Sequence, residues 1–368
     1  MEFFPLQVKE ITPETADTVT LVFDVPEELS DRFVFKQGQH ITVRVELGGH
    51  EVRRSYSMSS SPMEQVLAVT VKKVEGGVVS THLNEKIKVG DFIDVGTPDG
   101  RFYSTLNPDK RRTYFLFGAG SGITPLMSIL KTILEGEAMS TVFLLYGSRN
   151  EENIIFRNAL DQFSERYSGQ LFVEYVLSQP KKEIAGGLFG MFKKSSSNWQ
   201  GKTGRIGSKV VNTFLDENMA QGPEDECQYF VCGPGDMADI VKKALLGRGV
   251  QAKQVHTEHF VNATHIPGDI AATGATGGKQ VIVHLNGERI ELPVPDGATI
   301  LDVLVKAKYE PPYSCTAGAC STCMAKIING KVKMDACYAL DDDEVKAGYI
   351  LTCQSHPETS VVELTYDM

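Results

Sequence analysis

Four cysteines constrain this chain more than any other feature of its sequence. They follow the pattern C-x4-C-x2-C, with a fourth cysteine thirty positions later, at Cys315, Cys320, Cys323 and Cys353. This spacing is typical of a [2Fe–2S] cluster, in which two irons share four thiolates. The small spacer residues let backbone N–H groups approach the inorganic sulfides. Zinc is the alternative, but four-cysteine zinc sites usually pair two short C-x2-4-C units, whereas here the fourth cysteine stands alone.

The segments around these cysteines predict a small domain. Residues 281–294 form two alternating apolar runs around Asn286-Gly287, which is a hairpin signature. Residues 299–308 carry apolar side chains at helical spacing, and the chain closes on the strand-like run VVELTY. Hairpin, helix, cysteine loop and strands together predict an α+β domain of the β-grasp kind over residues 280–368. This part resembles the plant-type ferredoxins.

Length and composition limit the remaining possibilities. A chain of 368 residues predicts two or three domains, and no run approaches the roughly 20 apolar residues of a membrane helix. The first residues lack a signal-peptide pattern, so we expect a cytoplasmic protein. A net charge of −10 argues against binding nucleic acid. The odd total of seven cysteines does not suggest a disulfide framework, and Cys337, outside the pattern, is interpreted as a buried small hydrophobe.

The segment before the cysteine domain has the composition of a linker. Residues 263–279 are dominated by Gly, Ala and Thr, with no lasting hydrophobic periodicity. A flexible chain of this length spans roughly 20–25 Å. Two interpretations stay open: the cysteine domain swings between two electron partners, or the segment is a plain spacer.

Short strand-like runs separated by turn residues predict an antiparallel β-barrel at the N-terminus. One of these runs ends in Arg54-Ser-Tyr56-Ser57. This motif resembles the flavin-binding edge of the ferredoxin–NADP reductase superfamily. The resemblance implies that Arg54 pairs with a flavin phosphate, that Tyr56 stacks on the isoalloxazine and that Ser57 hydrogen-bonds near N5. It also implies a second flavin-phosphate segment at Gly77 and Ser80, where a following helix would offer its N–H groups.

A glycine-rich turn follows the apolar strand that starts near Tyr114. It reads Gly118-Ala-Gly-Ser-Gly-Ile-Thr-Pro125 and leads into a helix, the context that a nucleotide-binding loop requires. The spacing resembles the pyridine-nucleotide loop of the same superfamily, not the G-x-G-x-x-G of the classical dinucleotide fold. The resemblance assigns nucleotide contacts to Gly120, Gly122, Thr124 and Pro125. Strands that alternate with helices beyond this point predict a doubly wound parallel α/β sheet.

Three later strand ends carry further candidates. Cys232 and Gly233 end an apolar strand, where open sheets bind ligands, and the superfamily places this Cys-Gly-Pro beside the nicotinamide. Phe260 fits the aromatic residue that covers the flavin ring in relatives, so the resemblance makes Ser57, Cys232 and Phe260 the catalytic candidates. Arg149 ends another strand and would pair with the 2′-phosphate of NADPH, which we therefore expect over NADH.

The order of the modules predicts a multidomain protein that resembles the reductase components of multicomponent oxygenases. We expect an FAD-binding barrel at 1–108, an NAD(P)-binding domain at 109–262, the linker at 263–279 and the [2Fe–2S] domain at 280–368. The segment from Gly330 to Gln354 is especially similar to the reductase subunits of phenylacetyl-coenzyme A epoxidases, so we expect such an epoxidase as the partner. The reductases of steroid hydroxylases share much of the same pattern. Residues 185–200, which include Trp199, are interpreted as a loop insertion.

The resemblance implies a route for electrons from NADPH or NADH through FAD to the cluster, and then to a separate oxygenase. A flavin is needed because the nicotinamide gives two electrons at once and the cluster takes one. Two other interpretations stay open. One is a diaphorase or a reductase for a steroid or aromatic-ring hydroxylase. The other is a non-catalytic redox-sensing or zinc-stabilised interaction protein.

Overall fold

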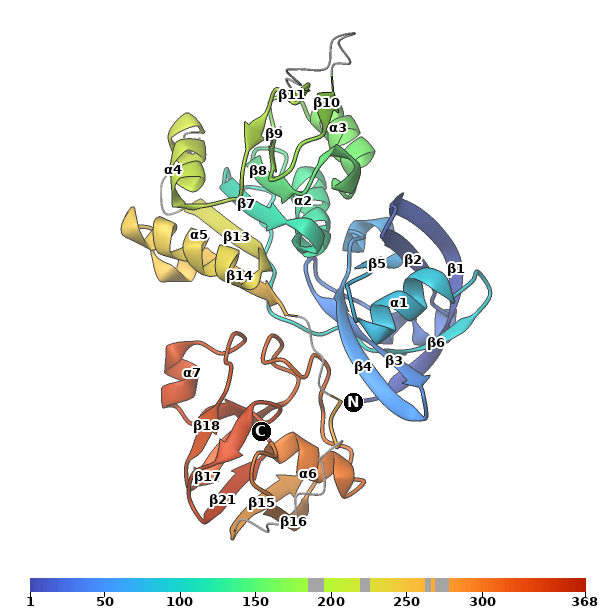
Figure 1. Ribbon diagram of the computed structural model, residues 1–368, viewed down its shortest axis with the longest axis vertical. Helices are drawn as coiled ribbons and strands as arrows, with labels where there is room; N and C mark the ends of the chain where they lie inside the picture. Colours follow the sequence, from blue (N-terminus) through green and yellow to red (C-terminus); the bar gives the residue numbers. More distant parts are fainter. Residues whose placement is uncertain (185–194, 219–225, 262–265, 269–277) are drawn as a thin grey trace.

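Three sheets divide the chain into three bodies that meet at one junction (Figure 1). The computed structural model describes residues 1–184, 195–218, 226–261, 266–268 and 278–368. Most of the predicted linker lies outside these residues, so its role stays a prediction. None of the helices in the described ranges is long and apolar enough to cross a membrane.

The N-terminal body is an antiparallel barrel, as predicted. Buried side chains at alternate positions of a strand, such as Leu21 and Phe23, point into one core. A bridge between Met58 and Val69 joins the two ends of the sheet and closes it. In sheet order the strands are β4 (His50–Ser57), β3 (His40–Leu47), β6 (Phe92–Gly96), β1 (Phe3–Thr15), β2 (Thr18–Asp24) and β5 (Leu67–Lys72). One helix, α1 (Val78–Glu85), lies across β5, and Asn84 Nδ2 donates to Val71 O at 3.1 Å.

The middle body is the predicted parallel sheet with helices. Its inner strands are apolar along their whole length, as expected of strands that helices cover on both faces. In sheet order they are β12 (Lys202–Thr203), β9 (Leu171–Leu177), β8 (Thr141–Ser148), β7 (Thr113–Ala119), β13 (Cys227–Pro234) and β14 (Val255–Phe260). The helices are α2 (Ile123–Gly136), α3 (Arg157–Arg166), α4 (Ser208–Glu217) and α5 (Gly235–Gly247). The carboxyl ends of β7, β13 and β14 point toward the other two bodies (Figure 1).

The predicted insertion is only partly described. Residues 185–194 lie outside the described ranges, while the flanking strands β10 (Lys182–Ile184) and β11 (Ser195–Ser197) pair antiparallel. Trp199 follows them, and its Nε1 donates to Lys202 O at 3.0 Å. Its ring packs edge-on against Tyr175, with centroids 6.4 Å apart. The end of the insertion is therefore packed against the sheet.

A buried carboxylate fastens the start of the middle body. Glu137, at the end of α2, is completely buried. Its Oε1 accepts from the Asn107 amide at 2.7 Å and from Arg112 Nη1 at 2.9 Å. Its Oε2 accepts from the hydroxyls of Tyr114 at 2.9 Å and Ser140 at 2.7 Å. One side chain thus ties the segment that leaves the barrel to the end of a helix.

Replacing Glu137 with alanine should lower the free energy of unfolding by about 3–5 kcal/mol, because the substitution leaves a cation and two hydroxyls without their acceptor. Chemical denaturation followed by circular dichroism would measure the loss. Glu226→Ala is the matched control, since Glu226 also pairs with Arg112 but lies at the surface. Equal losses in the two variants would contradict the special role of Glu137.

The C-terminal body is the predicted β-grasp domain. In sheet order its strands are β16 (Glu288–Val294), β15 (Lys279–Leu285), β21 (Val361–Thr365), β17 (Met324–Asn329) and β19 (Tyr349–Leu351). The hairpin at Asn286-Gly287 is confirmed, and both residues have positive φ, as a two-residue turn of this kind requires. The predicted helix is α6 (Ile300–Lys306), capped by Thr299. The remaining elements are β18 (Val332–Met334), β20 (Ser355–Pro357) and α7 (Asp342–Lys346).

The C-terminal body contacts the barrel through the segment that precedes the cysteine loop. Thr42 Oγ1 donates to Ser314 Oγ at 2.8 Å, and Ser55 Oγ lies 2.6 Å from the same atom. The Arg53 guanidinium lies over the Tyr313 ring, 4.2 Å from its centroid. These contacts place the cysteine loop beside β4, the strand that carries the predicted flavin motif.

Candidate active site

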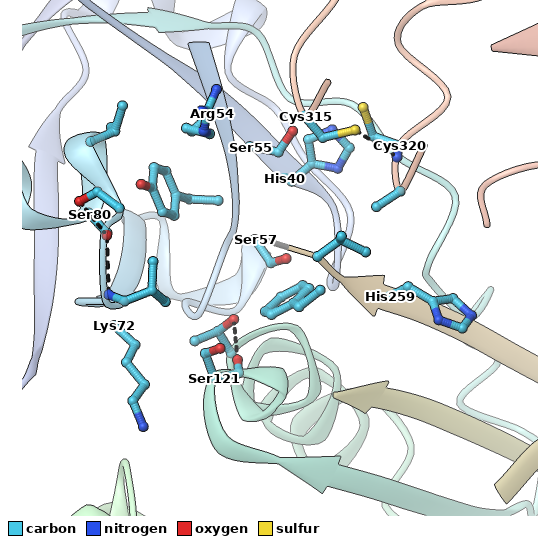
Figure 2. Close-up of a pocket in the computed structure, with 18 of the residues that line it drawn as sticks. His40, Arg54, Ser55, Ser57, Lys72, Ser80, Ser121, His259, Cys315 and Cys320 are labelled. Atoms are coloured by element: carbon cyan, nitrogen blue, oxygen red, sulfur yellow. Dashed lines mark hydrogen bonds between the residues drawn. The ribbon is translucent and has the colours of Figure 1, made fainter. Parts of the chain in front are cut away.

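A pocket opens where the three bodies meet (Figure 2). Its empty space, out to the open mouth, is about 1120 Å³. This value includes solvent at the mouth, so the pocket is a partly open cleft and not an enclosed cavity. Lys72 and Ser80 lie at one end, and Cys315 and Cys320 lie at the other (Figure 2). The sequence-predicted residues that line it are Arg54, Tyr56, Ser57, Gly77, Ser80, Thr124, Phe260, Cys315 and Cys320.

The start of α1 forms one end of the pocket. Gly77 is the N-cap residue, and a Cβ there would lie 2.4 Å from Val74 Cγ2 and 2.6 Å from Ser80 Oγ, so only glycine fits. Ser80 Oγ accepts from the Val74 amide and donates to Gly77 O, each at 3.2 Å. Ser80 thus shapes the turn, while the free N–H groups of the first helical turn offer an anion site.

Strand β4 supplies the long wall of the pocket. Burial lowers the pKa of Arg54, and the nearby Tyr56 and Cys315 oppose that shift. The guanidinium remains a cation at neutral pH and suits a phosphate. Burial raises the pKa of Tyr56 well above its ordinary value, so its phenol stays neutral. A neutral ring on this wall suits stacking on a flat cofactor.

Ser57 and Glu258 join the barrel to the middle body. Ser57 Oγ donates to Glu258 Oε2 at 3.2 Å across the pocket. Burial raises the pKa of Glu258 to about 7, and the hydrogen bond from Ser57 limits that rise. Cys232 lies nearby but does not line the pocket, and burial together with Glu258 raises the pKa of its thiol. The group with a pKa near neutrality is therefore the carboxyl and not the predicted thiol.

The glycine-rich turn packs against the end of β13. A Cβ at Gly122 would lie 2.1 Å from Cys232 O, so the turn reaches the strand only without a side chain. Gly120 has a φ of 56°, and Thr124 Oγ1 donates to Ser121 O at 3.0 Å. Pro125 lies in the first turn of α2, where a missing N–H costs little. Ser121 and Thr124 line the pocket directly, whereas Gly120, Gly122 and Pro125 lie behind its wall.

The last strands position the remaining middle-body candidates. Gly233 pairs with His259 and lies outside the pocket lining. Phe260 ends β14 and lines the pocket, where an aromatic residue was predicted. Arg149 follows β8 at the same edge of the sheet and is exposed. The structure thus gathers Phe260 with the flavin motif and leaves Arg149 further along the edge.

The four predicted cluster ligands lie together in the C-terminal body. The amides of Cys320 and Ala317 donate to Cys315 Sγ at 3.3 and 3.5 Å. The Cys315 thiol neighbours those of Cys320 and Cys353, and Cys353 neighbours Cys323. Amide donors aimed at a sulfur compensate the negative charge of a thiolate, so this donor set fits the cluster.

The cysteine loop is tightly packed at Gly318. A Cβ at Gly318 would lie 2.9 Å from Ala336 O, and its φ of 71° favours glycine. A second segment therefore covers this loop closely.

Sequence reasoning gave no role to Glu258 and His40, two polar residues that line the pocket. Glu258 precedes the recognised Phe260 by two positions, and an acidic residue at the end of an apolar strand was its only signal. His40 is 95% buried, and its Nε2 has no hydrogen-bond partner in the described part of the chain. Burial lowers its pKa, so its imidazole is neutral at pH 7. It lines the pocket beside Cys320, a neighbour 280 positions away.

Models of three protein families match this chain in the order of its three bodies. Residues 5–103 match the oxidoreductase FAD-binding domain. Residues 116–243 match the oxidoreductase NAD-binding domain, and residues 283–358 match the 2Fe-2S iron-sulfur cluster binding domain. The predicted cofactors FAD, NAD(P)H and a [2Fe–2S] cluster are thereby confirmed as classes.

Curated relatives match over nearly the full length. One component of the 1,2-phenylacetyl-CoA epoxidase from Escherichia coli is 32% identical, with 99% of this chain and 98% of the relative covered. The ferredoxin reductase component of 3-ketosteroid-9-alpha-monooxygenase from Rhodococcus rhodochrous is 33% identical over 98% and 96%. The solved structure of phthalate dioxygenase reductase shares the fold, with a TM-score of 0.59, 22% identity and coverage of 99% and 98%.

Proposed function

Because this chain belongs to the FAD- and [2Fe–2S]-containing reductase components of oxygenase systems, within the ferredoxin–NADP reductase superfamily, we propose that it supplies a phenylacetyl-coenzyme A epoxidase with electrons. The chain is an NAD(P)H-dependent flavin and iron–sulfur oxidoreductase, and a reductase component implies a separate oxygenase. The match to the Escherichia coli epoxidase component supports this choice of partner. We also propose a cytoplasmic location, because none of the seven cysteines forms a disulfide.

One observation carries the proposed route: side chains from all three bodies line a single pocket. Tyr56 and Ser57 come from the barrel, Phe260 from the middle body and Cys320 from the C-terminal body. The predicted flavin site therefore adjoins both the predicted nicotinamide site and the predicted cluster.

The residues of the barrel would hold the flavin. Arg54 and the N–H groups at the start of α1 would bind its phosphates, and Gly77 keeps that approach open. Tyr56 would pack against the ring system, with Phe260 as the cover on the middle-body side. The bound FAD would supply the conversion between a two-electron hydride and single electrons. Both aromatic rings would also exclude water from the reacting face.

Ser57 and Glu258 would set the polarity of the hydride-transfer site. Ser57 already donates to Glu258, so the carboxyl fixes the hydroxyl in one orientation. A carboxylate here would stabilise the positive charge that appears on the nicotinamide as the hydride leaves. Cys232, together with Gly120, Gly122, Pro125 and Gly233, would shape the nicotinamide side from behind the pocket wall. Cys315, Cys320, Cys323 and Cys353 would hold the cluster.

We also propose that NADPH is preferred over NADH. Arg149 is an exposed cation at the end of β8, the place where a 2′-phosphate would be read. The neighbouring acids are engaged elsewhere: Glu152 pairs with Lys181, and Glu151 Oε2 accepts from the Lys181 amide at 3.0 Å. Both carboxylates are thus bound by Lys181, so neither is positioned to repel the negative charge of a 2′-phosphate.

Arg149→Ala should lower kcat/KM for NADPH by about threefold to tenfold, because one charge-assisted contact to the 2′-phosphate is lost at an exposed site. NADH lacks that phosphate, so its kcat/KM should change by less than about twofold. Steady-state reduction of an artificial acceptor would measure both values. Arg166→Ala, at the far end of α3, is the control. An equal loss with both nucleotides would contradict the assignment.

Turnover with purified oxygenases tests the proposed partner. The reductase is mixed with phenylacetyl-coenzyme A epoxidase and its substrate, and NADPH-dependent product formation is followed. The matched comparison is a 3-ketosteroid 9α-hydroxylating oxygenase, because reductases of that class are 32–34% identical to this chain. Faster turnover with the steroid enzyme would show that the steroid oxygenase, and not the epoxidase, is the partner. The proposed electron route within the reductase would be unaffected.

A further inference from the structure

A stacked pair of rings joins the C-terminal body to the middle body. The rings of Tyr338 and His259 have centroids 4.8 Å apart and planes inclined by 26°. Tyr338 belongs to the C-terminal body and His259 to β14, so the stack crosses between bodies. His259 is 7% exposed, and its Nδ1 has no hydrogen-bond partner among the residues that the structure describes. Ring packing is thus a principal contact of this side chain.

Tyr338 is fastened to the cysteine loop. The amides of Tyr338 and Ala339 both donate to Gly318 O, at 3.0 and 3.1 Å. Gly318 lies between Cys315 and Cys320 in the chain and packs closely under Ala336 O. A displacement of Tyr338 would therefore also displace the loop that contains these two cysteines.

His259 belongs to the strand end that forms the other side of the pocket. Its neighbours in the strand, Glu258 and Phe260, both line the pocket, and Glu258 accepts the hydrogen bond from Ser57. β14 is the edge strand of its sheet and pairs only with β13. Glu258, His259 and Phe260 thus all line the predicted flavin site, and His259 also stacks on the tyrosine that is hydrogen-bonded to the cysteine loop.

We propose that the His259–Tyr338 stack docks the cysteine loop on the middle body, in addition to the barrel contacts at Tyr313 and Ser314, and that it thereby sets the rate of electron transfer from flavin to cluster. The inference rests on the proposed function and names two positioning residues for it. A further contact of the C-terminal body, the ion pair of Glu344 with Arg101, is solvent-exposed, so salt screens it. Salt does not screen the stacking of the two aromatic rings in this way.

The electrons balance as follows. NADPH leaves two electrons and a hydrogen on the flavin as a hydride and departs as NADP⁺. Two successive transfers each move one electron from the reduced flavin to the oxidised cluster, and the flavin releases its proton to solvent. The oxygenase removes each electron from the cluster before the next arrives. Docking concerns only these single-electron transfers, so the earlier hydride step should not depend on the stack.

Tyr338→Ala in the full holoenzyme tests the proposal. After anaerobic rapid mixing with NADPH, the reduction of the flavin and of the cluster can be followed separately by absorbance. Cluster reduction should slow by roughly twofold to tenfold, the change in docked population that loss of one aromatic pair gives. Flavin reduction should keep its rate. Tyr338→Phe retains the ring and should transfer electrons as the unsubstituted protein does.

A double-mutant cycle supplies the second test. His259→Ala combined with Tyr338→Ala should slow cluster reduction no further than the Tyr338 substitution alone. Small-angle X-ray scattering should give a larger radius of gyration for Tyr338→Ala and an unchanged one for Tyr338→Phe. An unchanged transfer rate and radius in Tyr338→Ala would overturn the proposal, as would Tyr338→Phe behaving like alanine. If NADPH failed to reduce the flavin of the unsubstituted protein, the proposed function would be wrong, while scattering would still test the docking.

Discussion

Replacing Cys320 with serine should reduce electron delivery to a one-electron protein acceptor by at least about a hundredfold. Loss of a direct ligand should exceed the 10- to 100-fold effects that are typical of groups behind the ligands. NADPH should still reduce the flavin at an unchanged rate, because the flavin motif lies on β4 of a different body. Anaerobic rapid mixing would follow the flavin by absorbance, and electron paramagnetic resonance would measure the reduced cluster.

Cys337→Ser is the matched control for this substitution. Cys337 lies in the same body and packs in the same hydrophobic cluster as Cys323 and Cys353. It stands outside the C-x4-C-x2-C pattern, so its loss should leave the cluster signal intact. A Cys320 variant that also lost flavin reduction would argue against separate modules. A Cys337 variant without a cluster would show that the ligand set is wrongly assigned.

Local sequence patterns predicted the parts of the site that short segments build. The cysteine loop needs four thiolates and small spacers, and the start of α1 needs Gly77 where a Cβ would strike Val74. The Asn286-Gly287 hairpin needs two residues with positive φ. Apart from the fourth thiolate, Cys353, each requirement is met within a few residues of chain. The sequence alone therefore identifies these features and the order of the three bodies.

The contacts between bodies could not be predicted in this way. Ser57 meets Glu258 across 201 positions, and Ser314 meets Thr42 across 272. His259 and Tyr338 give no signal until a strand end and a loop are brought face to face. Such pairs depend on how whole bodies dock, and no local periodicity or spacing in the sequence predicts that docking.

Glu258 is the residue where this long-range assembly changes the chemistry most. Its carboxyl lies in the pocket, and burial raises its pKa to about 7, against an ordinary value of 4.5. Below pH 7 the group is mostly neutral, and above pH 7 it is mostly a carboxylate. Only the carboxylate can stabilise the positive charge that forms on the nicotinamide during hydride transfer. The rate of flavin reduction should therefore rise as the pH passes through about 7.

Glu258→Gln should remove that rise. The amide keeps the shape of the side chain and accepts from Ser57, but it carries no charge. At pH 8 flavin reduction should be about tenfold to a hundredfold slower than in the unsubstituted protein, and at pH 5.5 the two rates should converge. Stopped-flow measurements between these pH values would establish both profiles. Glu165→Gln, on the exposed face of α3, should follow the unsubstituted profile.

The same substitution should alter stability with the opposite dependence on pH. Because the folded pKa of Glu258 lies above the unfolded value, its contribution to stability is complete below pH 4.5 and is lost as the pH rises through about 7. A shift from 4.5 to about 7 corresponds to a loss of about 3 kcal/mol. Glutamine avoids this loss, so Glu258→Gln should unfold at higher denaturant than the unsubstituted protein at pH 8 and should lose most of that advantage at pH 5. A variant that is slower at pH 8 yet gains no stability there would show that Glu258 acts on the nicotinamide without being buried as a carboxylic acid.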